Sequence, residues 1–323
     1  MERIAFGSCL RQEEPQPVWD AIIGAEPDVF LFVGDNIYAD TTNPAVMSAA
    51  YRKLAGQPGY RRLRALCPVH ATWDDHDYGR NDAGAEYPMR VESERFFLDF
   101  FQVPAGAPER SRPGVYAAHS YGPPGRRVQL LLLDTRSFRG PLTPAPPTTR
   151  CPKANYAENR DTTITLLGEA QWAWLEQQLL EPADLRIIAS SIQVIPNQHC
   201  FEKWANLPHE RARLFDLIAR TAANGVLLVS GDRHFAEISR LDDPAVGYPL
   251  YEVTASGMNS AGPGRGERNR FRLSKDNFRE DNFGLIAIDW SRSDTRLTLQ
   301  IRDARGEVGV EHRLRLSELQ SPP

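Results

Sequence analysis

Four short apolar segments of the chain each end in residues that are typical of metal sites. The segments cover residues 3–6, 30–33, 69–73 and 225–230, and the segment at 30–33 has the length and composition of a strand buried on both faces. Open α/β sheets place their functional groups just beyond the carboxyl ends of such strands. One Gly-Asp pair after a strand is a common turn, but four such ends together predict a polynuclear metal site. The residues at these ends are Cys9, Asp35, Tyr38, Asp75, His76, Asp77, Asp232 and His234.

Along the rest of the chain, the hydrophobic pattern predicts helices that alternate with strands at first and mainly antiparallel strands towards the end. Helical periodicity is found in residues 17–23, 44–55, 89–101, 166–180 and 208–224. The first helix lies between two apolar strands, which implies that these strands are parallel. Further strands are predicted at residues 115–121, 128–133, 185–195, 251–254, 285–290, 295–302 and 308–314. We therefore expect an α/β protein with two packed mixed sheets flanked by helices, in a single domain over residues 1–323 that is strand-rich and antiparallel from about residue 248.

Some side chains are predicted to be buried and others to be solvated. The helix at 89–101 should bury Val91, Phe96, Phe97, Phe100 and Phe101, and the helix at 166–180 should bury Leu167, Trp174, Leu175 and Leu179. The polar run from Glu202 to Glu210 is predicted to be a solvated loop. Residues 140–165 and 257–282 lack periodicity, and the second segment is either a lid over an anionic ligand or a disordered surface loop.

Composition narrows the function classes. The chain has 38 Lys and Arg against 42 Asp and Glu, so it has no global positive field for nucleic acid or an anionic membrane. No window is long and apolar enough for a membrane span. A strand predicted from Arg3 leaves no room for a signal peptide, so we expect a cytoplasmic protein if Met1 is native and a periplasmic or secreted one if a signal has been removed. Cys151 and Cys200 either pair or remain free thiols, and no cysteine spacing indicates a zinc finger.

The candidate ligands suit phosphate ester hydrolysis. Two cations that share a carboxylate can neutralise the phosphoryl group and generate a hydroxide at neutral pH, and Asp35 is the natural bridge. The thiolate of Cys9 and the phenolate of Tyr38 prefer a strongly Lewis-acidic ion, which favours Fe³⁺ over zinc. Oxygen donors from Asp75, Asn81 and Asp232 suit Ca²⁺ or Mn²⁺, and His234 adds a nitrogen.

Other residues near these motifs have two interpretations each. His76 lies between Asp75 and Asp77, so it can protonate a leaving-group oxygen with a carboxylate fixing its tautomer, or it is a histidine of a surface turn. Arg80 and Arg233 either clamp phosphate oxygens or pair with the nearby carboxylates. Gln193 follows another predicted strand and is either a substrate or metal contact or a satisfied core amide.

The motifs resemble those of one family. GSC at 7–9, GDNIY at 34–38, WDDHD at 73–77 followed by Asn81, and GDRH at 231–234 are similar to those of PhoD-type alkaline phosphatases, within the calcineurin-like metallophosphoesterases. The resemblance extends from Gly7 to about Gly284. It implies a four-layer αββα sandwich, a site with Fe³⁺ and Ca²⁺, and activity on phosphodiesters and phosphomonoesters.

The resemblance also implies individual roles. Cys9, Asp35, Tyr38 and His234 would bind iron, and Asp35, Asp232 and either Asp75 or Asn81 would hold calcium. Gln193 falls where other members of the superfamily have a metal-binding histidine. Mn²⁺ or Zn²⁺ remain alternatives to these ions.

We therefore expect an enzyme that acts on a small-molecule, lipid or polymer phosphate ester. One alternative is a catalytically silent metal- or phosphate-binding protein on the same scaffold. Another is a nuclease, although basic residues cluster only at residues 265–279 and no specific nucleic-acid binding is expected. The sequence does not predict an oligomeric state.

Overall fold

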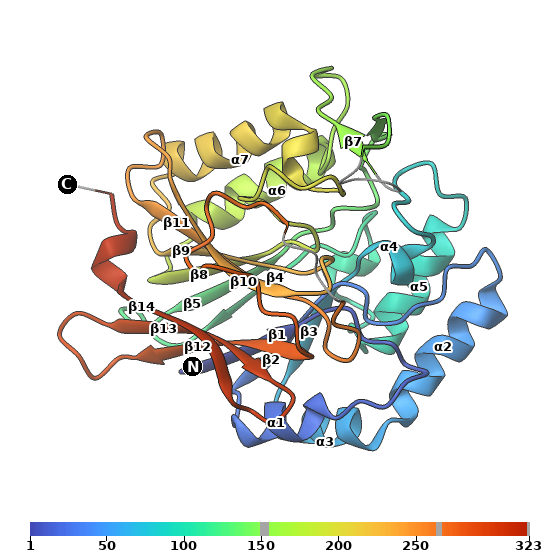
Figure 1. The fold of residues 1–323 in the computed structure, drawn as a ribbon, viewed down its shortest axis with the longest axis horizontal. Helices are drawn as coiled ribbons and strands as arrows, with labels where there is room; N and C mark the ends of the chain where they lie inside the picture. The colour runs from blue at the N-terminus through green and yellow to red at the C-terminus, as the bar shows by residue number, and fades with distance from the viewer. Residues whose placement is uncertain (149–154, 263–266, 322–323) are drawn as a thin grey trace.

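The computed structural model describes residues 1–148, 155–262 and 267–321. Its two six-stranded sheets lie face to face, and helices cover their outer faces (Figure 1). The first sheet has the spatial order β14 (Val308–Arg315), β13 (Arg296–Asp303), β12 (Asn282–Asp289), β1 (Arg3–Gly7), β2 (Val29–Val33) and β3 (Val69–Thr72). The second has the order β10 (Ala236–Asp242), β11 (Pro249–Ala255), β9 (Val226–Ser230), β8 (Leu185–Ala189), β5 (Val128–Leu132) and β4 (Ala117–Tyr121). The predicted αββα sandwich is confirmed.

Helices cover the two outer faces unequally. The first sheet carries α1 (Val18–Gly24), α2 (Pro44–Gly56), α3 (Pro58–Leu66) and α5 (Arg90–Phe100), while the single turn α4 (Asp75–Tyr78) follows β3. The second sheet carries α6 (Gly168–Leu180) and α7 (Pro208–Arg220) (Figure 1). Short elements complete the chain: β6 (Thr143–Pro144), β7 (Tyr156–Ala157), and the 3₁₀ turns η1 (Pro108–Arg110), η2 (Trp204–Asn206) and η3 (Leu316–Leu319).

Strand β2 shows why the central strands are apolar throughout. Val29, Leu31 and Val33 point into the core between the sheets, whereas Phe30 and Phe32 point into the core under α1, α2, α3 and α5. Successive side chains of a strand alternate between faces, so a strand covered on both faces has no polar position. Its parallel pairing with β1 and β3 confirms the predicted strand, helix, strand unit.

Four elements differ from the sequence predictions. Helix α3 was not expected, and neither was β10, whose second face buries Glu237 and Ser239 instead of apolar residues. Strand β8 ends at Ala189 instead of residue 195. Strand β11 belongs to the second sheet, where it pairs parallel to β9, so the C-terminal strands do not form one antiparallel group.

Three burial predictions are wrong. Val91 is 70% exposed because it lies on the solvent side of α5. On α6 the fully buried tryptophan is Trp172, and Trp174 is only partly buried. The run from Glu202 to Glu210 is largely buried instead of solvated, because its polar side chains find partners inside the protein.

Two further predictions touch residues outside the described ranges. Cys9 and Cys67 are buried free thiols, but the alternatives for Cys151 and Cys200 depend on Cys151, which lies outside the described residues. Residues 263–266 of the predicted lid also lie outside them. None of the helices in the described ranges is long and apolar enough to cross a membrane.

Candidate active site

The first group of candidate ligands converges at the carboxyl ends of strands from both sheets. The Sγ atom of Cys9 lies 3.4 Å from Oδ2 of Asp35, and the hydroxyl of Tyr38 donates to the same oxygen at 3.2 Å. The Tyr38 hydroxyl also lies 3.0 Å from Nε2 of His234, which follows β9 of the second sheet. The ligand atoms of Cys9, Asp35 and His234 all lie within 4.8 Å of one another. The parallel order of β1 and β2 places Cys9 beside Asp35, as the sequence predicted.

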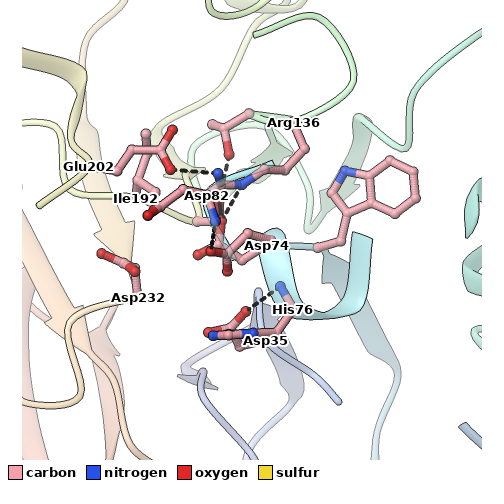
Figure 2. A network of polar contacts seen from close by, with 12 residues as sticks. Asp35, Asp74, His76, Asp82, Arg136, Ile192, Glu202 and Asp232 are labelled. Carbon is pink, nitrogen blue, oxygen red and sulfur yellow. Dashed lines mark hydrogen bonds and ion pairs between the residues drawn. The ribbon is translucent and has the colours of Figure 1, made fainter. Parts of the chain in front are cut away.

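A second group shares Asp35 with the first. Ligand atoms of Asp35, Asp75 and His76 also lie within 4.8 Å of one another. The backbone N–H of His76 donates to Oδ1 of Asp35 at 3.3 Å, as drawn in Figure 2. One oxygen of Asp35 therefore faces each group, which is the arrangement expected of a bridging carboxylate.

Four of the candidate ligands have a backbone conformation that non-glycine residues seldom adopt. The φ angles are 58° at Cys9, 51° at Asp35, 66° at Asp232 and 55° at His234. Left-handed conformations cost free energy in non-glycine residues and gather at functional sites. Gly34 allows the turn at Asp35, because its φ is 101° and a Cβ there would lie 2.6 Å from the Cβ of Asp74.

The electrostatics of the two groups favour a bound cation. Burial, with the negative charges of Cys9 and Asp75, raises the pKa of Asp35 well above its usual value. Burial also raises the pKa of Cys9 and, with the charge of Asp35, that of Tyr38. The buried Oδ1 of Asp75 has no hydrogen-bond partner among the described residues. Buried acidic donors of this kind are stable when they bind a metal, so the residues present fit metal ions.

His76 is positioned by a carboxylate that the sequence analysis did not identify. Its Nδ1 lies 2.7 Å from both oxygens of Asp40, and its ring centroid lies 4.4 Å from that of Tyr38. Burial lowers the pKa of His76, but the hydrogen bond with Asp40 and the charges of Asp35 and Asp75 raise it to about 10. The raised pKa favours a protonated ring that can deliver a proton, whereas a neutral ring would be a candidate ligand of the second group.

Asp77 lies beneath the site. It accepts hydrogen bonds from the backbone N–H groups of Asp74 at 2.7 Å, Asp35 at 3.2 Å and Asn36 at 3.4 Å. It thereby joins the turn after β2 to the turn after β3, which favours a positioning role over contact with substrate.

Asn81 and Arg80 are exposed on the segment after α4. The amide of Asn81 donates to Oδ2 of Asp82 at 2.6 Å, and its backbone N–H donates to Asp40. Asp232 is partly buried, and its desolvation raises its pKa to about 6 against the opposing charge of Arg233.

Arg233 and Gln193 are both buried and paired. Arg233 donates to Oδ2 of Asp232 at 3.4 Å and pairs with Glu267, while its Nε has no partner within the described part of the chain. Gln193 donates to Glu237 and to Thr254, each at 2.9 Å, but its buried Oε1 has no partner among the described residues, so the amide is only partly satisfied.

A buried charge network behind the site was missed by sequence reasoning. Arg136 donates through Nε to Oδ1 of Asp74 at 2.6 Å and through Nη1 to Oε2 of Glu202 at 2.6 Å (Figure 2). Arg139 pairs with the other oxygen of Glu202 at 2.9 Å. Ser191, just after β8, donates to Asp74 at 2.7 Å. The network thus fixes the residue immediately before Asp75. The strand-end pattern marks Asp134 to Arg136, which follow an apolar strand, but it does not identify their partners.

Ser256 is a second missed residue. Its hydroxyl lies 3.1 Å from Sγ of Cys9 and accepts the backbone N–H of His234 at 2.7 Å. It follows β11 directly, so the strand-end pattern also marks it.

Comparisons with known proteins agree with this geometry. The model of a family described as PhoD-like phosphatase matches residues 4–299. Comparison with curated proteins gave no match. The solved structure of PhoD is similar at 16% identity and a TM-score of 0.74, with 100% of this chain and 72% of that chain covered.

Two other solved structures share the fold at lower similarity. GAP50, described as the anchor in the inner membrane complex of Plasmodium, has 11% identity and a TM-score of 0.59, with 97% of this chain and 88% of that chain covered. A dimetal phosphatase from Danio rerio has 12% identity and a TM-score of 0.55, with 98% of this chain and 99% of that chain covered. At such identities these likenesses show the fold.

Proposed function

Because the chain belongs to the PhoD-like phosphatase family and is therefore a phosphoesterase, we propose that it hydrolyses phosphodiesters and phosphomonoesters at a polynuclear site for Fe³⁺ and Ca²⁺. The observation that carries this proposal is the position of Asp35 in both groups of candidate ligands. When bound, the ions would neutralise charge on the phosphoryl group and provide a hydroxide nucleophile at neutral pH. The proposed substrates are small-molecule, lipid or polymer phosphate esters.

The chain's own residues have distinct proposed roles in holding the ions. Cys9, Asp35, Tyr38 and His234 hold the iron, and His234 is oriented by its Nδ1, which lies 2.6 Å from the carbonyl oxygen of Ser260. Asp35 and Asp232 hold calcium together with Asp75 or Asn81. The unpartnered buried oxygen of Asp75 supports Asp75, whereas Asn81 is exposed.

The remaining roles concern the substrate. His76 holds a proton for the leaving-group oxygen, and Asp40 fixes its ring. Arg233 lies against Asp232 and offers its free Nε–H to a phosphate oxygen. Asp77 positions Asp35 and does not itself contact the substrate.

Elemental analysis with visible spectroscopy tests the proposed metals. The purified protein should contain iron and calcium and show a visible charge-transfer band that is lost in Tyr38→Phe, because the phenolate would be an iron ligand. Tyr116→Phe, at a buried tyrosine outside the candidate site, is the matched control and should keep the band. Zinc or manganese alone without a band would overturn the metal assignment, and no stoichiometric metal would favour the silent binding protein.

Replacement of His76 tests proton delivery. His76→Ala should slow esters with poor leaving groups by about 10²-fold and activated p-nitrophenyl esters much less, because only poor leaving groups need a proton in the transition state. Steady-state kinetics on both ester types, with metal content measured in parallel, provides the readout. Equal losses on the two types would argue against this role, and loss of metal would instead make His76 a ligand.

A further inference from the structure

Three nitrogen-bearing side chains lie around Phe201. The guanidinium of Arg233 lies 4.0 Å from the centroid of the Phe201 ring, and the ring of His199 lies 6.5 Å from it. The ammonium of Lys203 donates to the carbonyl oxygen of Phe201 at 3.0 Å. Arg233 also contacts Asp232, so this Phe201 cluster adjoins the candidate metal site.

The cluster is buried and poorly satisfied. His199 is only 7% exposed, and neither of its ring nitrogens has a hydrogen-bond partner among the described residues. Lys203 is 6% exposed, and within the described ranges no carboxylate lies within 4.0 Å of its ammonium. Buried polar groups in native proteins are nearly always paired, so the unpartnered imidazole of His199, beside an ammonium whose printed partner is a carbonyl oxygen and not a carboxylate, points to a missing anion.

The nearby carboxylates do not supply that partner. Glu202 is held by Arg136 and Arg139, and Glu267 is held by Arg233. Burial, followed by the charge of Arg233, lowers the pKa of Lys203 to about 8. Burial, followed by the charges of Arg233 and Lys203, lowers the pKa of His199 well below its usual value. Both shifts arise first from burial and then from neighbouring positive charge, which a bound anion would offset.

We propose that His199 and Lys203, beside Arg233, form a subsite for a second phosphate group of the substrate, beyond the ester that is cleaved. This inference rests on the proposed function and narrows its substrate class to esters that carry two phosphates. A phosphate would accept hydrogen bonds from both side chains and provide the negative charge that Lys203 lacks. The subsite therefore selects among substrates and takes no part in bond cleavage.

A matched pair of substrates tests the subsite in the metal-loaded enzyme. Two p-nitrophenyl phosphodiesters that differ only by a second phosphate on the retained alcohol are compared for kcat/KM. The wild-type protein should prefer the doubly phosphorylated ester by about tenfold. Lys203→Met should remove this preference through KM and change turnover of the other ester less than about twofold, whereas Lys203→Arg should retain it.

Controls separate the subsite from general damage. Lys53→Met, at a half-exposed lysine of α2, should leave both substrates unaffected. Equal losses on both esters in Lys203→Met, or no loss at all, would overturn the subsite. If Lys203→Met does not fold, the wild-type enzyme is inhibited with non-hydrolysable analogues that carry one or two phosphates. Equal inhibition by the two analogues also overturns the subsite.

Failure of the proposed function gives a different result. In that case the wild-type protein hydrolyses neither ester. Calorimetric titration with inorganic phosphate then tests the subsite alone. Phosphate binding to the wild-type protein that becomes at least about tenfold weaker in Lys203→Met supports the subsite. Identical titrations of the two proteins overturn it.

Discussion

Asp35→Asn is expected to lower phosphoester hydrolysis by about 10³-fold or more and to reduce the metal content of the purified protein. Asp35 belongs to both groups of candidate ligands, and each of its oxygens faces one of them. The amide keeps the shape of the side chain but removes the negative charge that two cations would share. Activity on a chromogenic diester and elemental analysis of the same preparation provide the two readouts.

A matched control is available for this variant. Asp20→Asn removes an exposed aspartate that pairs with Arg62 on the surface, and it should change neither activity nor metal content. If Asp35→Asn protein were fully active and replete with metal, the bridging assignment would be refuted.

Arg136→Met is expected to destabilise the protein by about 3–5 kcal/mol, because it leaves the buried Asp74 without its cation and Glu202 with Arg139 alone. Arg136 is buried between Asp74 and Glu202, which are themselves buried. Methionine fills a similar volume but provides no charge and no N–H donor. The free energy of unfolding in urea, measured for variant and wild type, gives the difference.

A variant that breaks a surface ion pair provides the control for this unfolding experiment. Arg220→Met breaks an ion pair with Glu176 in which the arginine side chain is 53% exposed, and it should cost less than about 1 kcal/mol. Comparable losses in the two variants would show that the buried network contributes no more than a surface pair.

The arrangement of the candidate site could be predicted because it depends on strand ends. Asp35 and Asp75 each follow an apolar segment, and parallel strands place such residues at one edge of a sheet. The same rule brings Cys9 beside Asp35. Because the rule uses only local sequence and strand direction, it needs no knowledge of side-chain packing.

The charge network could not be predicted in this way. Arg136 is 62 residues from Asp74 and 66 from Glu202, and nothing local in the sequence marks them as partners. Polar residues in a loop are usually solvated, so the run after Phe201 was assigned to the surface. Strand β10 was missed for the same reason, because Glu237 is buried there by pairing with Arg272 from a distant loop.

The carboxylate shared by the two ligand groups also links the two metal positions thermodynamically. An ion bound by Cys9, Tyr38 and His234 would draw on the same negative charge of Asp35 that the second ion needs. By reciprocity, each ion would change the affinity of the other by the same factor. The two positions would then fill in a preferred order, and the affinity measured for either ion would depend on what its neighbour holds.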